Sequence, residues 1–143
     1  MVECEFCAII AGGQDAHVLF EDDHTLAFLD ENPARDGHAI VVPKHHRAEL
    51  LGTDGKTGQA VLSTVDDVAA ALRAVLDPDG FSVFYTSGQL VGSVTHARVH
   101  VVPRDEDDGV SLALDRTSFD HDTAAALAER VRDAVESDGH AGT

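Results

Sequence analysis

The run from Thr95 to Arg104 limits the fold of this 143-residue chain more than any other segment. Polar and apolar side chains alternate along it. His96, Arg98 and His100 occupy every second position, and Ala97, Val99 and Val101 occupy the positions between and after them. Successive side chains of a β-strand point to opposite faces of the sheet. The run therefore predicts a strand over Thr95–Val102, closed by Pro103, with one apolar face toward the core. Three cationic or potentially cationic groups on the other face favour an anion site, because packed cations need partners.

Hydrophobic periodicity elsewhere predicts an α+β fold with an antiparallel sheet. The long helix shows apolar residues at three- and four-residue spacing, from Val61 to Leu76. We expect elements in the order α-β-β-β-α-β-β-α: Cys7–Ala11, His17–Glu21, Thr25–Asp30, His38–Pro43, Thr57–Leu76, Phe81–Tyr85, Thr95–Val102 and Asp122–Glu136. Strands that run together favour an antiparallel sheet. The length suits one domain over residues 1–143, with a core at about 3–104 and an acidic loop and C-terminal helix at 105–143.

The charge of the chain is strongly acidic. Twenty-six acidic residues face ten basic ones, for a formal net charge of −16, and the only lysines are Lys44 and Lys56. Such a charge repels itself unless counterions screen it, and the Debye length falls to about 3 Å at 1 M salt. We therefore expect a salt-rich cytoplasm, as in halophilic archaea, with an ordinary acidic protein as the alternative. A long nucleic acid is excluded as a partner, since the surface would repel its phosphates.

Neither a membrane span nor a leader is expected. No apolar run approaches the roughly 18 residues that a bilayer span requires, and the opening residues lack a basic region. The two cysteines, Cys4 and Cys7, are spaced Cys-x-x-Cys, which in a cytosolic protein indicates a metal or redox site rather than a structural disulfide. A redox motif would follow a strand. Since none is predicted before Cys4, metal binding is favoured.

Several blocks together resemble the histidine-triad (HIT) superfamily. His96–Arg104 resembles its signature, His-φ-His-φ-His-φ-φ followed by Pro-Arg, where φ is apolar. Further matching blocks occur in the same order along the chain: Cys4–Gly12, Phe20–Asp23, Ala27–Asp30 and Gly37–His46. The resemblance covers about Glu3 to Arg104. It implies a five-stranded antiparallel sheet with flanking helices, a homodimer formed through the long helix and an adjoining strand, and a pocket for a nucleoside phosphate.

The resemblance also implies a structural zinc site. Zinc-binding members of the family place ligands at the positions that match Cys4, Cys7, His46 and His96. Two thiolates and two imidazoles form the closed tetrahedral set typical of structural Zn²⁺. His45 is an alternative to His46, because both lie in the same short stretch.

The chain departs from the family at the residue that matters most for catalysis. The middle histidine of the triad is the nucleophile in the family, and Arg98 stands at that position. A guanidinium has no nucleophilic lone pair, but its planar fork of donors suits phosphate oxygens. The family's substrate-orienting asparagine and glutamine are also replaced, within Tyr85–Gly88 and Val91–Val94. By resemblance, His100 and His38 remain the candidate catalytic residues, and nucleotide contacts fall to Asp30 (ribose), Ser93, Arg98 and His100.

Three functions follow from these residues. The first is a protein that binds a nucleoside phosphate such as AMP or ADP, with covalent hydrolase activity weak or lost. The second is an active hydrolase or nucleotidyl transferase for nucleoside phosphoramidates or dinucleoside polyphosphates, in which His100 or His38 replaces the nucleophile. The third is a dimeric, zinc-containing interaction protein that binds no nucleotide. The sequence leaves the base and the natural ligand open, and the acidic stretch Asp105–Asp108 is interpreted as a solvated face.

Overall fold

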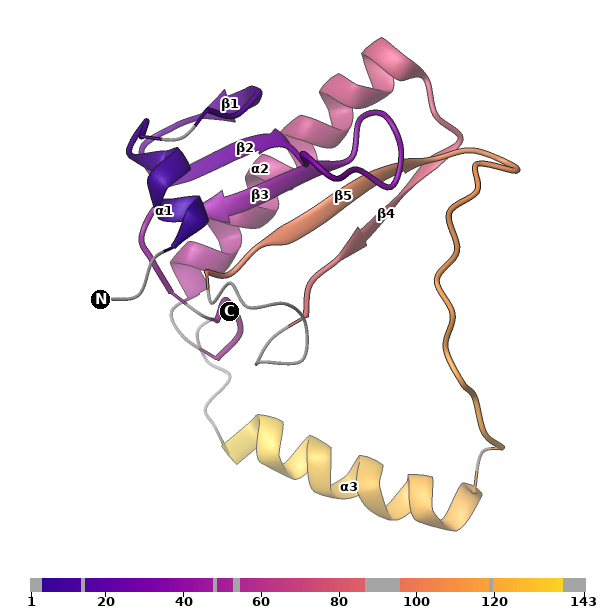
Figure 1. Cartoon of the computed structure of the whole chain (residues 1–143). Coiled ribbons are helices and arrows are strands. Elements are labelled where there is room, and N and C mark those ends of the chain that lie inside the picture. Colours follow the sequence, from indigo (N-terminus) through magenta and orange to yellow (C-terminus); the bar gives the residue numbers. More distant parts are fainter. Residues whose placement is uncertain are drawn as a thin grey trace. The chain divides into compact units, whose positions relative to one another are not determined.

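Five strands organise the N-terminal part of the chain: β1 (Val18–Glu21), β2 (Thr25–Leu29), β3 (Ala39–Pro43), β4 (Gly80–Phe84) and β5 (Val99–Arg104). They pair antiparallel in the order β1-β2-β3-β5-β4 (Figure 1). This computed structural model describes residues 4–13, 15–47, 49–52, 55–86, 96–118 and 120–137. The expected α+β class, the five-stranded antiparallel sheet and the order of elements are confirmed.

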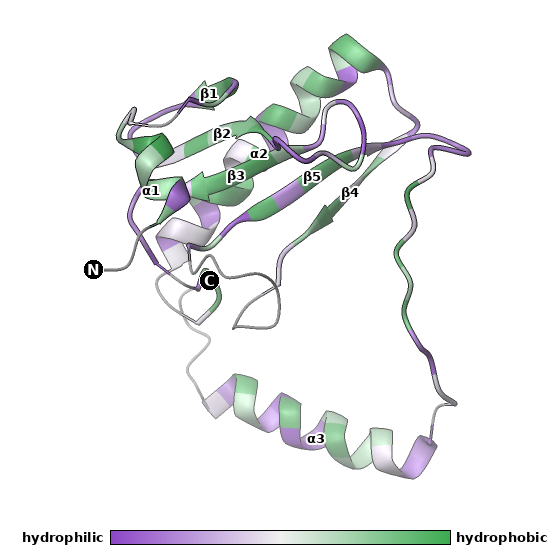
Figure 2. Ribbon diagram, viewed as in Figure 1, coloured by the Kyte–Doolittle hydropathy of each residue, from purple (hydrophilic) through white to green (hydrophobic). Residues whose placement is uncertain are grey.

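Both faces of the central strands are buried, each by a different helix (Figure 1). Helix α2 (Gly55–Leu76) covers one face, and the short helix α1 (Glu5–Ile10) lies on the other. The core beneath α2 contains Val61, Val65, Val68 and Leu72 with Ala27, Val41, Val99 and Val101. The core beneath α1 contains Phe6, Leu26, Phe28, Ile40 and Val42. Figure 2 shows the resulting concentration of hydrophobic residues in β2 and β3.

The predicted apolar stripe of α2 is buried along most of the helix but not at its end. Val75 and Leu76 remain 78% and 45% exposed, so these two residues of the stripe lie outside the core. Both line an apolar cavity of about 380 Å³ between α2, β1 and the loop before β3. Near the middle of the helix, Thr64 is buried and its hydroxyl lies 2.6 Å from that of Thr25, so the two satisfy each other.

The boundaries of β5 differ from those predicted. The strand begins at Val99 and runs through Pro103 to Arg104, so Pro103 does not close it. Pairing between β5 and β3 stops at Val101, which lies opposite Ala39. Beyond that point β5 pairs only with β4, and a proline can occupy a position whose N–H would face away from the ladder. Residues 96–98 therefore precede the strand proper.

A glycine sets the path of the chain into β3. Gly37 has a φ of +92°, and an added Cβ would lie 2.7 Å from Leu76 Cδ1 and 2.9 Å from Pro103 Cγ. A residue with a side chain would meet both backbone strain and a steric clash there. The turn places His38 immediately before the first residue of β3.

The acidic turn after β5 combines exposed and ion-paired carboxylates: Glu106 and Asp107 are exposed, as the sequence suggested for the whole stretch, whereas Asp108 is not. The Asp108 carboxylate is only 3% exposed and accepts a hydrogen bond from Arg104 Nε at 2.7 Å. Hydrogen bonds from the Arg104 side chain and from the backbone N–H groups of Val110 and Asp105 hold the pKa of Asp108 well below its usual range. Arg35 also contacts Asp108 and Asp105, which ties the loop before β3 to the end of β5.

The chain divides into two compact units, Met1–Val110 and Ser111–Thr143. The second contains helix α3 (His121–Ser137), close to the predicted Asp122–Glu136. Its apolar stripe is exposed, with Leu127, Val131 and Val135 at 54%, 51% and 45%. A single domain over the whole chain stays a prediction. In the part of the chain that the structure describes, we find no helix with the length and apolar character of a membrane span.

Candidate functional site

The segment that enters β5 places its cationic groups on the α1 face of the sheet. Ala97, Val99 and Val101 are 3%, 8% and 0% exposed and belong to the core beneath α2. By alternation His96, Arg98 and His100 lie on the opposite side, toward α1. The two faces predicted from the sequence are thus observed, although the first three residues lie before the strand.

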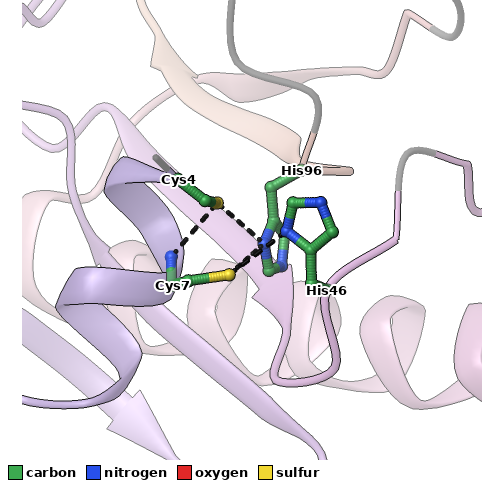
Figure 3. A group of neighbouring side chains, drawn as sticks. All are labelled: Cys4, Cys7, His46 and His96. Atoms are coloured by element: carbon green, nitrogen blue, oxygen red, sulfur yellow. Dashed lines mark hydrogen bonds between the residues drawn. The ribbon is translucent and has the colours of Figure 1, made fainter. Parts of the chain in front are cut away.

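Cys4, Cys7, His46 and His96 meet in one cluster at the start of α1 (Figure 3). Cys7 Sγ lies 3.2 Å from His46 Nδ1 and 3.5 Å from His96 Nδ1, and Cys4 Sγ lies 3.4 Å from His96 Nδ1. Cys4 also caps α1, since its sulfur accepts a hydrogen bond from the Cys7 backbone N–H at 3.3 Å. This cap starts the helix at Glu5 rather than at the predicted Cys7. One candidate ligand atom from each side chain lies within 4.8 Å of all the others.

The hydrogen bonds of His96 suit a metal ligand. Its Nε2 lies 2.7 Å from the Pro43 carbonyl oxygen, which can only accept, so Nε2 carries the proton. The lone pair is then on Nδ1, the atom that faces both sulfurs. A metal-bound histidine is typically fixed in this way by a carbonyl behind it. His46, and not its neighbour His45, belongs to the cluster.

Without a cation, burial and the neighbouring Cys4 disfavour ionisation of the Cys7 thiol. Burial raises the pKa of Cys7 to about 11, and the hydrogen bond and charge of Cys4 add to the rise. Burial also lowers the pKa of His96; the hydrogen bond to the Pro43 carbonyl opposes this, and the nearby His46 and Arg98 lower it further. Two imidazoles and two thiols form a donor set that a divalent ion with soft-ligand affinity would complete. These four residues therefore fit Zn²⁺.

A second cluster joins Asp30, His38 and His100 on the same face of the sheet. His38 Nε2 lies 2.9 Å from His100 Nδ1 and 3.4 Å from Asp30 Oδ2. The other nitrogen of His38, Nδ1, accepts the Ala34 backbone N–H at 2.9 Å. A backbone N–H can only donate, so Nδ1 of His38 accepts. The proton of the neutral ring is therefore on Nε2, which donates to His100 Nδ1. The remaining nitrogen of His100, Nε2, is then protonated as well.

Burial lowers the pKa of His100 below its usual value of 6.5. The adjacent His38 lowers it further, the Asp30 carboxylate opposes this, and the Arg98 guanidinium adds a smaller lowering. The ring of Phe84 stacks on His100 with centroids 4.7 Å apart and planes 10° apart. Phe84 thus fixes the plane of the imidazole from β4, a role that its sequence position did not reveal.

A cavity of about 610 Å³ opens beside these residues, between α1 and the sheet. Arg98, His100 and Asp30 line it together with apolar side chains from α1 and the sheet. The sequence did not identify the other residues of the lining, which come from α1, β2, β3 and the loops before β1 and after β2: Glu5, Phe6, Ile9, Asp15, Ala16, His17, Phe28, Leu29, Glu31, Asn32 and Ile40. Ser93, the last predicted contact, lies outside the described residues, as does most of the stretch that replaces the family's substrate-orienting amides.

This fold agrees with comparisons to known proteins. The model of the HIT domain matches residues 11–107, so the chain belongs to the HIT domain family. It is 34% identical over 127 residues to an adenylylsulfatase of Arabidopsis thaliana, which covers 87% of this chain and 64% of that protein. The structure of a histidine triad nucleotide-binding protein from Candida albicans superposes with a TM-score of 0.82 at 25% identity, over 94% of this chain and 99% of that one.

A further solved structure bears on the cysteine cluster. It is a zinc-bound histidine triad family protein from Mycobacterium smegmatis, 34% identical, with a TM-score of 0.71 over 80% of this chain and 84% of that one. The fold of a zinc-bound relative is therefore shared by this chain.

Zinc binding should release protons and strengthen as the pH rises. Because the pKa of Cys7 is about 11 in the absence of a cation, its thiol is protonated at neutral pH and must lose that proton to become a ligand. We expect one equivalent of zinc per chain, with tighter binding at pH 8 than at pH 6.5. Calorimetry in two buffers of different ionisation enthalpy measures the protons released. Cys7→Ser should lose most of the affinity, whereas His45→Ala should retain it; equal losses would contradict the assignment.

Proposed function

We propose that this chain binds a nucleoside phosphate in the cavity beside α1, and that covalent hydrolase activity of the family kind is weak or lost. One observation carries the proposal. Arg98, which the resemblance places at the nucleophile position, lines the cavity beside His100 and Asp30. A guanidinium presents several fixed N–H donors to phosphate oxygens and cannot form a bond to phosphorus.

The hydrogen bonds of the two histidines support a binding rather than a nucleophilic role. Both nitrogens of His38 are engaged, one by Ala34 N–H and the other with His100 Nδ1. His100 Nε2 carries a hydrogen in the neutral form described above, and it also does so in the imidazolium form. The groups nearest to an incoming phosphate are therefore donors in either state, which suits an oxyanion and leaves no free imidazole lone pair for attack.

The rest of the cavity suits a nucleoside. Asp30, at the end of β2, is 16% exposed on its side chain and offers carboxylate oxygens to ribose hydroxyl groups. Apolar walls from α1 and the sheet, Phe6, Ile9, Phe28 and Ile40, can hold the flat face of a base. The donor-rich end at Arg98 and His100 suits a phosphate, and the apolar slot suits a base, so the pocket has the chemistry to recognise AMP or ADP. Asp30 is one of four carboxylate residues in the lining, with Glu5, Asp15 and Glu31.

Active turnover is the second candidate, and the similarity to an adenylylsulfatase favours it. In that case His100 or His38 would have to supply the lone pair, which requires breaking the chain of hydrogen bonds from Ala34 through His38. A protein that binds zinc but no nucleotide is the third candidate, and it predicts no calorimetric signal with AMP.

Arg98 variants separate these candidates. Wild type should bind AMP and turn over an adenosine phosphoramidate poorly. Arg98→Ala should weaken AMP binding by roughly 1.5–3 kcal/mol, the range for hydrogen bonds to a charged group. Arg98→His would restore an imidazole at this position and should gain some hydrolysis, because a nucleophile then faces the phosphate. Calorimetry and a fluorogenic phosphoramidate assay measure the two properties.

His17→Ala is the matched control, since His17 lines the same cavity but lies apart from the Asp30, His38 and His100 cluster. It should affect AMP binding less than Arg98→Ala does. Wild-type hydrolysis that is unchanged in Arg98→Ala and abolished in His100→Ala would show that His100 carries the chemistry. That result would contradict the binding proposal and favour the active hydrolase.

We also propose that the protein is a zinc-containing homodimer adapted to a salt-rich cytoplasm. Strand β4 lies at one edge of the sheet, and its Val83 and Phe84 are 50% and 37% exposed. An apolar edge strand is a ready pairing surface. The reduced thiols of Cys4 and Cys7 suit the cytoplasm, and the net charge of −16 suits dense counterions.

Salt should therefore favour both folding and association. In multimolar KCl we expect the mass of a dimer by light scattering and a higher melting temperature than at low salt, because screening relieves repulsion within and between chains. A melting temperature that is flat or falls with KCl would contradict salt adaptation. The mass of one chain in multimolar KCl would contradict the dimer.

A further inference from the structure

One aromatic side chain contacts both the cysteine–histidine cluster and the proposed phosphate pocket. Phe6 is the buried residue of α1, 7% exposed, and lies in the chain between Cys4 and Cys7. Its ring meets that of His96 edge-on, with centroids 6.0 Å apart. The guanidinium carbon of Arg98 lies 5.3 Å from the centre of the same ring, and Phe6 also lines the 610 Å³ cavity.

Arg98 is linked to the cluster by a second route. Its Nη1 donates to the backbone carbonyl of His96 at 3.4 Å. The orientation of the guanidinium thus depends in part on the backbone of His96 and on the face of Phe6. A cation is attracted to the face of an aromatic ring, so movement of the ring changes the position of the guanidinium.

Helix α1 needs support to hold Phe6 in this position. It has six residues, too few to be stable alone in water. Metal–thiolate bonds at Cys4 and Cys7 would hold it on either side of Phe6, whereas the S···N contacts of 3.2–3.5 Å within the cluster are weak hydrogen bonds. The helix forms one wall of the nucleoside pocket through Glu5, Phe6 and Ile9.

We infer that Phe6 couples the two sites, so that zinc at Cys4, Cys7, His46 and His96 and a nucleoside phosphate at Arg98 and His100 bind cooperatively. The inference rests on the proposed function. With the metal bound, Phe6 and Arg98 are held in place before the phosphate arrives, so less conformational entropy is lost when the nucleotide binds. Without it, α1 is held by its apolar packing on the sheet and by the weak hydrogen bonds of the cluster, so part of its ordering is left to the nucleotide. Phe6 is thus a positioning residue that acts through Arg98.

The test closes a thermodynamic cycle on the full chain under reducing conditions. The Kd for AMP is measured by calorimetry on zinc-loaded and on chelator-treated protein. The zinc affinity is measured by competition with a chromogenic chelator, with and without saturating AMP. We expect zinc to tighten AMP binding by about fivefold or more, and AMP to tighten zinc binding by the same factor, because coupling is reciprocal.

Two variants locate the coupling. Phe6→Leu keeps an apolar side chain against Phe28 but removes the ring that faces His96 and Arg98, so zinc should still bind at one per chain while the coupling factor falls toward one. Ile9→Ala is the matched control on the same helix and in the same pocket; it should weaken AMP binding in both metal states and keep the coupling factor.

Each outcome decides a different point. Equal AMP affinity with and without zinc would overturn the coupling and leave the proposed function intact. Full coupling retained in Phe6→Leu would overturn the role of Phe6. No AMP binding in either metal state would overturn the proposed function and the coupling with it.

Discussion

The burial of Ala97, Val99 and Val101 against α2 is the constraint on which the rest of the site depends. Fully burying a valine contributes about 1.5–3 kcal/mol, and both valines of this segment are at most 8% exposed. A slip of one residue would turn these side chains to the other face and push His100 and Arg98 into the core. Their direction toward α1 is therefore fixed by packing on the opposite face, without any contribution from a ligand.

Hydrogen bonds then decide what the side chains on that face can do. The chain from Ala34 N–H through His38 to His100 sets which nitrogens are protonated. As a result, His100 and Arg98 both present hydrogen-bond donors at one end of the pocket. These donors suit an oxyanion and do not suit nucleophilic attack. At the other end of the same segment, the bond from His96 to the Pro43 carbonyl turns a lone pair toward two thiols. His96 and His100 thus differ in their chemistry because each has a different hydrogen-bond partner on its other ring nitrogen.

Much of this could be predicted from local sequence, since alternation and helical periodicity are local properties. The order of elements, the two faces around Val99 and the proximity of Cys4 to Cys7 follow from spacing alone. Bringing His46 and His96 to the cysteines required the family resemblance. Contacts between distant segments were missed, such as the stacking of Phe84 on His100, the position of Phe6 and the burial of Asp108. These depend on how α1 and β4 pack on the sheet, which no short-range pattern encodes.

In the proposed function, Arg98 holds a phosphate where a nucleophile would otherwise attack it. A crystal structure of the zinc-loaded protein soaked with AMP tests this most directly. We predict AMP in the cavity, with phosphate oxygens within hydrogen-bond distance of the Arg98 guanidinium and of His100 Nε2, and with the ribose at Asp30. AMP bound away from Arg98, or no AMP in the cavity, would contradict this prediction.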